Sequence, residues 1–336
     1  NKGDFLDFSW ISAKRYINIA IAGICKNAGK TTVLNYILAN YHCQWGILST
    51  GRDGEPEDTL YKTPKPKVII PQGCLFCAEA KTLLPLGSGI SILTKTPFSR
   101  SNRELWIAQS EIDLKTEITG PATVCEQLAC ADLMKKMGAE KVLIDGSFDR
   151  KSIALSNAVD AIILSAGASF GNAQTIAEEL QRLITLSRIE TYKSPVLQQL
   201  ATQNNILIKD KGRWHSTGLA SLISNSTKLM EILSQTAKIS HLYIPGAYTS
   251  SVNNRIGKQL SGIQLIFRHP ECIKLSSDEL KHFLENQKPL TLIPFKLKAI
   301  TLNPHGVGSS DLDADEMHSF LRQIFPDYPL LDVMEI

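Results

Sequence analysis

The sequence lacks the features that mark membrane, secreted and nucleic-acid-binding proteins. No apolar run approaches the about 18–20 residues that cross a bilayer. The opening stretch NKGDFLDFSW is acidic and aromatic, unlike a signal peptide. Neither sign of charge dominates, since the 336 residues carry a formal charge of +3 and Lys and Arg are scattered. We therefore expect a cytoplasmic protein whose main partner is neither a membrane nor a nucleic acid.

Complete patterns for a catalytic zinc site or a calcium-binding loop are also missing. The seven histidines form no H-E-x-x-H motif, so a catalytic zinc is not expected. The segment 311–316, DLDADE, begins like a calcium loop but has Arg322 where the loop needs Glu, and it is interpreted as the acidic start of the last helix. Cys74 and Cys77 form a single C-x-x-C, for which metal binding, redox chemistry and a purely structural role remain open. The structural role is favoured, because no second C-x-x-C and no nearby His accompany the pair.

Short β-branched runs alternate with helical patterns along most of the chain. This alternation predicts an α/β fold with a mainly parallel, doubly wound sheet and a second α/β region. We expect an extension at 1–14, a nucleotide-binding domain at 15–192 and a C-terminal α/β domain at 193–336. An antiparallel hairpin is expected between 104 and 118. The main strands are expected at 17–22, 46–49, 68–70, 91–93, 142–144, 161–164, 206–208, 241–244, 263–267 and 297–302, and helices after residue 32, at 121–137 and at 172–186.

The stretch GICKNAGKTT lies between the first predicted strand and the first helix. It differs from the phosphate-binding pattern G-x-x-x-x-G-K-[ST] because Ile24 occupies the place of the first glycine. A strand that ends in a small-residue loop and opens into a helix directs several backbone N–H groups at one point, where the helix dipole is positive. We therefore predict a variant phosphate-binding loop. Its predicted nucleotide-binding residues are Gly23, Lys26, Asn27, Ala28, Gly29, Lys30, Thr31 and Thr32.

A nucleoside triphosphate is bound together with Mg²⁺, which needs an acid at the end of a neighbouring strand. The segment KVLIDG supplies Asp145 after an apolar run, and Asp53 and Glu55 lie in the loop after the second strand. We predict Thr31, Asp145 and Glu55 as Mg²⁺ ligands, and Lys30, Asp53 and Asp145 as the catalytic residues.

The base is predicted from the absence of a guanine-reading motif. The nearest match to [NT]-K-x-D is TKTP at 94–97, with Pro in place of the Asp. ATP is therefore the expected nucleotide.

A serine hydrolase is a competing interpretation. The segment GASFG at 167–171 matches G-x-S-x-G between a strand and a helix, with Ser169 as the nucleophile. Tight strand-to-helix turns select the same small residues, so this interpretation ranks below the phosphate site.

The loop KNAGKTT resembles the variant loops of the P-loop class that contains dethiobiotin synthetase, metal-insertion GTPases and partition ATPases. In that class a lysine early in the loop acts across a dimer, and Lys26 lies one position nearer the Gly-Lys pair than that lysine does. The resemblance makes a homodimer one expected arrangement.

Several further segments resemble one family within that class. GICKNAGKTT, GRDGE, IIPQG, DGSFDRKS, LSAGA and the closing LNP and PLLDV are similar to segments of the ATP-binding reactivase subunit of adenosylcobalamin-dependent lysine 5,6-aminomutase. The resemblance implies an ATP-hydrolysing chaperone that acts on the aminomutase together with a second reactivase subunit. The alternatives are an ATP-dependent small-molecule ligase or kinase of the dethiobiotin-synthetase type and a nucleotide-driven metallochaperone.

Overall fold

The computed structural model divides into two compact units. It describes residues 8–50, 67–99, 104–147, 156–236, 238–306 and 311–335. Unit 1 comprises Asn1–Ala177 and Lys296–Ile336, and unit 2 comprises Glu178–Phe295. This differs from the expected division at residue 192, because the last segment belongs to unit 1 rather than to the second domain. The expected N-terminal extension also differs, since Phe8 and Ile11 are buried in the core of unit 1.

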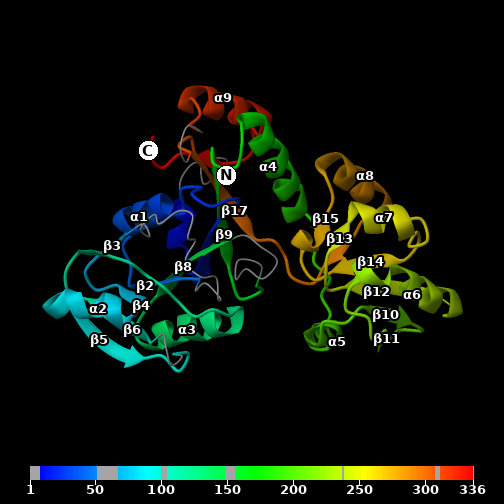
Figure 1. The fold of residues 1–336 in the computed structure, drawn as a ribbon, viewed down its shortest axis with the longest axis horizontal. Coiled ribbons are helices and arrows are strands. Elements are labelled where there is room, and N and C mark those ends of the chain that lie inside the picture. Colours follow the sequence, from blue (N-terminus) through cyan, green and yellow to red (C-terminus); the bar gives the residue numbers. More distant parts are fainter. Residues whose placement is uncertain are drawn as a thin grey trace. The chain divides into compact units, whose positions relative to one another are not determined.

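Within the described residues, unit 1 is built on a nine-stranded sheet (Figure 1). Its strands are β1 (Asn18–Gly23), β2 (Trp45–Ser49), β4 (Leu75–Glu79), β5 (Ile90–Lys95), β6 (Leu105–Ser110), β8 (Lys141–Ser147), β9 (Ala161–Gly167), β17 (Leu297–Asn303) and β18 (Leu330–Leu331). Their order is β18-β17-β9-β1-β8-β2-β4-β6-β5. Neighbours from β18 to β4 run parallel, whereas β6 is antiparallel to β4 and β5. The predicted α/β fold with a mainly parallel sheet is therefore confirmed.

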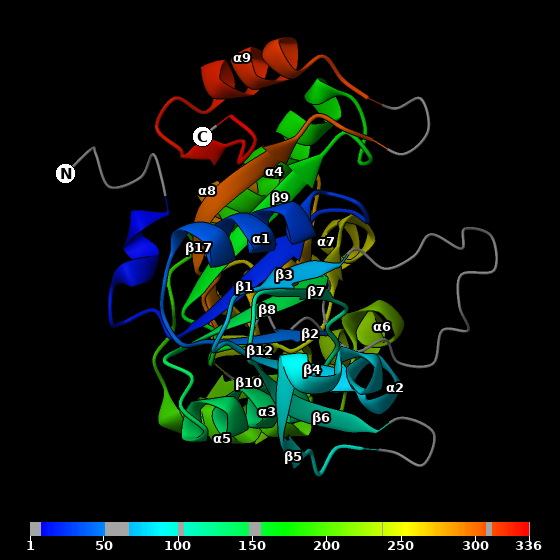
Figure 2. The same ribbon diagram turned by 90° about the vertical axis from the view of Figure 1, so that its left-hand side faces the viewer.

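Helices lie on both faces of this sheet. The helical segments of unit 1 are η1 (Ser9–Ser12), α1 (Lys30–Asn40), α2 (Ala80–Leu83), η2 (Leu84–Gly89), α3 (Val124–Lys136), α9 (Ala314–Ile324) and α4 (Ala173–Ser187), which contains the division at residue 177. Trp45 and Ile47 share a hydrophobic cluster with α1, whereas Gly46 between them faces Met134 of α3. Since side chains alternate along a strand, α1 and α3 cover opposite faces. Figure 2 looks onto the face that carries α1.

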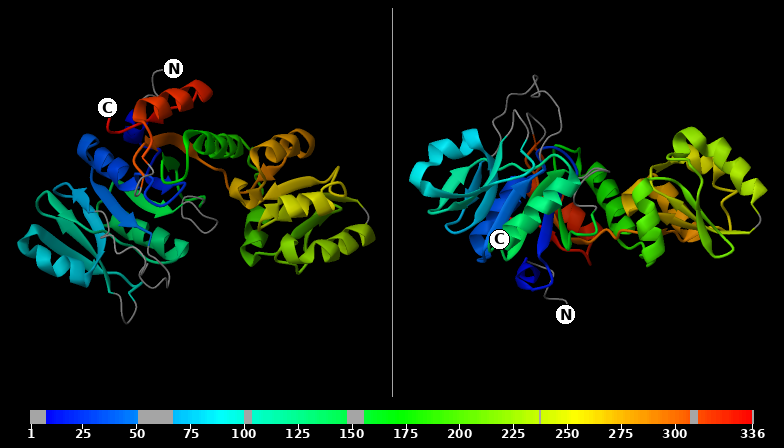
Figure 3. Two further views of the ribbon diagram at one scale, coloured as in Figure 1. Left: turned by 45° about the horizontal axis from the view of Figure 1, so that its top comes forward. Right: turned by 90° about the horizontal axis from the view of Figure 1, so that it is seen from below.

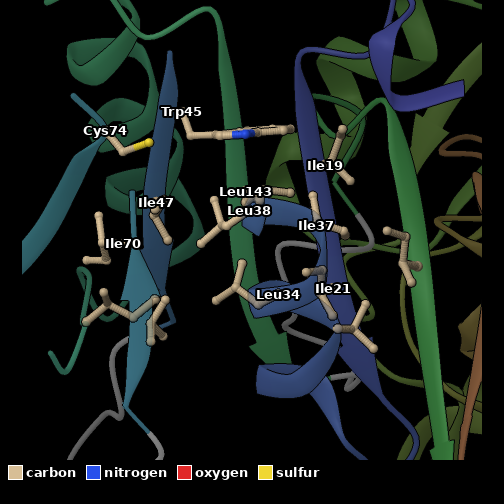
Figure 4. Packing of buried hydrophobic residues seen from close by; sticks show 14 of the residues in the cluster. Ile19, Ile21, Leu34, Ile37, Leu38, Trp45, Ile47, Ile70, Cys74 and Leu143 are labelled. Carbon is tan, nitrogen blue, oxygen red and sulfur yellow. The ribbon is translucent and has the colours of Figure 1, made fainter. Parts of the chain in front are cut away.

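Helix α1 is held on the sheet by an apolar stripe. Figure 4 shows Leu34, Ile37 and Leu38 directed at Ile19 of β1 and Leu143 of β8. All five side chains are at most 1% exposed. Full burial of such a side chain contributes about 1.5–3 kcal/mol. This stripe fixes α1, and with it the loop that precedes α1, against β1 and β8.

One local prediction was wrong, and the placement of the C-x-x-C is settled. The segment 104–118 does contain strands, but β6 pairs with β4 and β5, while β7 (Leu114–Thr116) pairs with β3 (Val68–Ile70), so the two do not form a hairpin. The C-x-x-C, which the pattern also allowed at the start of a helix, instead leads into β4. Cys74 belongs to the cluster on the α1 face, and Cys77, three residues further on, faces the other side of the strand. One metal ion cannot bridge two thiols that point to opposite faces, which agrees with the favoured structural role.

Unit 2 is a smaller α/β unit. Its described strands are β10 (Leu207–Asp210), β11 (Arg213–Ser216), β12 (Ile239–Ile244), β14 (Gln264–Phe267) and β16 (Leu290–Thr291), in the order β11-β10-β12-β14-β16, with β13 (Tyr248–Thr249) paired to β15 (Ile273–Lys274). Its helical segments are α5 (Pro195–Leu200), η4 (Ala201–Gln203), α6 (Leu222–Gln235), α7 (Ser250–Ile256), η5 (Pro270–Cys272) and α8 (Ser277–Gln287). The capping box of Ser276 and Glu279 begins α8. In the described part of the chain, no helix is long and apolar enough to cross a membrane.

Strand β17 brings the chain back into unit 1. It pairs in parallel with β9 through Leu297–Asn303, and Figure 3 shows the orange strand entering the sheet beside the green one. Two hydroxyls support this pairing inside the sheet, where Thr301 Oγ1 donates to Ser165 Oγ at 2.9 Å. The carboxyl end of β17 therefore lies beside the carboxyl ends of β9 and β1.

Candidate functional site

The strand order changes direction at β1. The chain leaves β1 through α1 and reaches β2 on the β8 side, whereas β8 is followed by β9 on the opposite side of β1. In open α/β sheets, ligands bind outside the carboxyl ends of the strands at such a point. The residues that follow β1, β8, β9 and β17 are therefore the first place to look for a site.

The loop between β1 and α1 turns sharply at this edge. The N–H of Ile24 still donates to the carbonyl of Ser165 on β9, at 3.0 Å. Asn27 (φ 59°) and Gly29 (φ 92°) then adopt left-handed conformations, which return the chain into α1. Ala28 between them is buried, whereas Lys26 and Asn27 are exposed. The predicted strand–loop–helix arrangement is thus present, with Gly23 as the last residue of β1.

The N-terminus of α1 is uncapped as far as the described residues show. Gly29 is its N-cap and offers no side-chain cap, and the first turn contains no acid. The first backbone N–H groups of a helix have no partner within the helix. Lys30 adds a cation where the helix dipole already favours an anion. Such an arrangement is unfavourable without a ligand and suits a bound anion.

The side chain of Lys30 lies back across the end of β1. A Cβ atom added to Gly23 would come within 3.3 Å of Lys30 Cδ and 3.1 Å of Ala28 Cβ. A larger residue at position 23 would therefore press on Ala28 and Lys30, which would have to shift by a few tenths of an ångström. The glycine that lies one place too early for the standard pattern thus makes room for the lysine.

Asp145 lies close to Lys30. It pairs in register with Ile21 of β1, and it points to the face of β8 that Leu143 and α1 occupy, because it is two residues beyond Leu143. Burial raises the pKa of the Asp145 carboxyl, and the positive charge of Lys30 partly opposes this increase. One carboxylate oxygen, Oδ1, is buried and has no hydrogen-bond partner among the described residues.

A buried, unpaired carboxylate oxygen beside an open helix N-terminus fits a metal–phosphate ligand. Asp145 offers an oxygen for Mg²⁺, and Thr31 in the first turn of α1 offers a hydroxyl. No cluster of three or more His, Cys, Asp or Glu side chains occurs in the described ranges. The predicted Asp53 and Glu55 lie outside the described residues.

Two neighbouring strands contribute residues that the sequence analysis did not assign to the site. Gly167 at the end of β9 approaches the loop so closely that an added Cβ would lie 3.0 Å from Ala28 Cα. Asn303 at the end of β17 donates from Nδ2 to the carbonyl of Asn27, at 3.2 Å. The segments LSAGA and LNP were noted only as a family resemblance. Their position beside the loop depends on strand pairing that local patterns do not reveal.

Cys25 lies within the loop and is partly buried. Burial raises the pKa of its thiol, whereas the charge of Lys30 and the backbone N–H of Gly167 lower it. The net increase makes Cys25 a weak nucleophile at neutral pH.

Ser169 does lie between β9 and α4, as the hydrolase interpretation requires. Its Oγ is buried and has no hydrogen-bond partner in the parts of the chain that the structure describes. A serine nucleophile needs a base within hydrogen-bond reach. The local geometry therefore supports the β1–α1 loop over Ser169 as the functional centre of unit 1.

Comparisons of this chain with protein-family models, with curated proteins and with solved structures found no match.

Proposed function

We propose that unit 1 binds and hydrolyses a nucleoside triphosphate, with ATP as the preferred nucleotide, at a variant P-loop formed by Gly23–Thr32. The observation that carries the proposal is the start of α1, where an uncapped helix N-terminus bears Lys30 and faces Asp145. Backbone N–H groups of the loop and the Lys30 ammonium would hold the phosphates. Thr31 and Asp145 would hold Mg²⁺, which neutralises charge on the phosphates when it is bound.

The residues at the start of α1 fit a nucleoside triphosphate bound with Mg²⁺ better than they fit a simple anion. An isolated anion site needs only N–H donors and a cation, whereas Asp145 adds a negative group that repels an anion at close range. That repulsion becomes attraction once a divalent metal lies between the carboxylate and the phosphates. A lysine, a hydroxyl and a carboxylate therefore fit a magnesium-bound nucleotide better than they fit free phosphate.

The binding experiment is a calorimetric titration with ATP, with and without Mg²⁺, and with GTP for comparison. We expect ATP to bind in the micromolar range or tighter, Mg²⁺ to strengthen binding, and GTP to bind more weakly. Release of inorganic phosphate from Mg²⁺-ATP, measured in the same buffer, tests hydrolysis. The proposal would be contradicted if neither ATP nor GTP bound to the protein.

The cellular role that we propose follows from the resemblance of the motifs. An ATP cycle at this site would act on a protein partner, as in the reactivase of the cobalamin-dependent aminomutase, rather than on a small phosphoryl acceptor. Addition of inactivated aminomutase with the second reactivase subunit should then raise the ATPase rate. Phosphate release that requires a small-molecule acceptor would instead favour the ligase or kinase.

A further inference from the structure

We propose that Asn303 is a positioning residue for the phosphate-binding loop. Its side-chain amide holds the Asn27 carbonyl on the β17 side of the loop, so that the N–H of the next residue, Ala28, is directed to the other side. This inference rests on the proposed nucleotide site. It assigns a part in that site to the last segment of the chain, which was expected to lie in a separate domain.

The amide of Asn303 has a specific orientation. Nδ2 donates to the carbonyl of Asn27 at 3.2 Å and to the carbonyl of His305 at 3.1 Å. Oδ1 accepts from the N–H of His305 at 3.2 Å. Only one of the two flip orientations of the Asn303 side-chain amide can donate to two carbonyls and accept from an N–H in these positions. Neither Asp nor Leu supplies the donor that Asn27 uses.

This contact orients a peptide group of the loop. The chain contains no cis peptide bond in its described parts, and in a planar trans peptide the C=O and the N–H point in opposite directions. Because the carbonyl of Asn27 points at Asn303, the N–H of Ala28 points away from Asn303. No hydrogen bond within the described residues uses that N–H. It is therefore without a partner among the described residues, in a residue that is only 1% exposed, and a ligand bound beside the start of α1 would satisfy it.

Close packing keeps the Asn303 side chain in place. A Cβ atom on Gly29 would lie 3.1 Å from Asn303 Cβ, and one on Gly167 would lie 3.4 Å from it. The backbone carbonyl of Asn303 also accepts from the N–H of Ala168, at 3.0 Å. The stem of the side chain thus lies against two glycines while its backbone is fixed in the sheet. A group held in this way can hold the loop in turn.

Two variants and one control test this role. Asn303→Leu removes every hydrogen bond of the side chain at similar volume, and Asn303→Asp keeps the acceptor for His305 but turns an oxygen toward the Asn27 carbonyl. Asn35→Asp is the control, because Asn35 Oδ1 accepts from the N–H of Ile69 and an aspartate retains that bond. The probes are Mg²⁺-ATP and inorganic tripolyphosphate with Mg²⁺, each titrated by calorimetry. Melting of the ligand-free proteins, followed by circular dichroism, controls for folding.

We expect the Asn303→Leu variant to bind both probes about tenfold more weakly, since one orienting hydrogen bond is lost. Asn303→Asp should weaken both further, because its charge lies near the phosphates. The control should bind both like the wild type. Equal losses for ATP and tripolyphosphate are the signature of loop positioning, since tripolyphosphate has no base or sugar. If the leucine variant does not fold, the aspartate variant carries the test.

Three results would count against the inference. Unchanged affinity for both probes would overturn it and leave the nucleotide site standing. A loss for ATP alone would also overturn it, because Asn303 would then contact the nucleoside instead of orienting the loop. Failure of the wild-type protein to bind either probe would remove the proposed nucleotide site, and the role of Asn303 with it.

Discussion

Replacement of Lys30 by methionine is the most direct perturbation of the candidate site. Methionine keeps most of the length and helix propensity of lysine and removes only the charge. The Lys30 side chain lies over Gly23 at the start of α1, close enough for its charge to lower the pKa of Asp145. The variant therefore separates the cation from the packing of the loop.

The size of the effect can be estimated from the surroundings of Lys30. A unit charge pair 4 Å apart contributes about 4 kcal/mol at an effective dielectric constant of about 20. Lys30 is only partly buried, so solvent screens part of this energy. A hydrogen bond to a charged group contributes about 1.5–3 kcal/mol in practice. We therefore expect Lys30→Met to weaken Mg²⁺-ATP binding about 10- to 150-fold.

Calorimetry with Mg²⁺-ATP measures this change, and Lys136→Met is the matched control. Lys136 is exposed in the last turn of α3, which leads into the amino end of β8 and so lies at the opposite edge of the sheet from the loop. The control removes the same charge and should keep the affinity of the wild type. Equal ATP affinity in the Lys30 variant and the wild type would refute the assignment of the phosphate site. An equal loss of ATP affinity in both variants would mean that the effect comes from the net charge of the protein and not from the position of Lys30.

The other predictions concern the carboxylate, the loop backbone and the thiol. Because the folded-state pKa of Asp145 is raised, ionisation of its carboxyl costs stability as pH rises. The Asp145→Asn variant should therefore melt at a higher temperature than the wild type at about pH 8, and at the same temperature near about pH 4. The reverse trend would contradict the burial argument. Gly29→Ala should lower the free energy of unfolding in urea by about 1–2 kcal/mol, since φ is 92° at residue 29, and an unchanged value would mean that the loop relaxes freely. Iodoacetamide should alkylate Cys25 more slowly than exposed Cys125 near neutral pH, and the ratio of the two rates should narrow at high pH, where the Cys25 thiol also ionises. ATP should protect Cys25 alone, as read by mass spectrometry.

The local parts of the site could be predicted from the sequence. The strand before Gly23, the helix after Gly29 and the acid at Asp145 depend on short-range patterns: an apolar strand, a small-residue turn and an amphipathic helix. The structure has these elements within three residues of their expected ends. The acidic segment 311–316, interpreted as the start of the last helix, does precede α9, where Asp313 accepts from the N–H of Glu316.

Pairing between distant segments could not be predicted in the same way. Strand β6 looked like half of a hairpin because β7 follows it closely, yet its partners are β4 and β5. A short apolar run such as that around Cys77 fits a strand or a helix equally well by periodicity alone. The role of Asn303 depends on β17 crossing from one end of the sequence to lie beside β9. No local pattern around Leu302–Pro304 encodes that neighbour.

The interrupted course of unit 1 has a consequence for how the protein is made. During synthesis, β1, α1, β8 and β9 leave the ribosome first, and all of unit 2 follows before β17. N-terminal parts of a chain begin to fold while the rest is still being synthesised. Until residue 303 emerges, β9 is a sheet edge without its β17 partner and the loop lacks its contact with Asn303. The loop between β1 and α1 would thus gain its contact with Asn303 only after unit 2 has been translated, so an ordered loop would report that unit 2 has already left the ribosome.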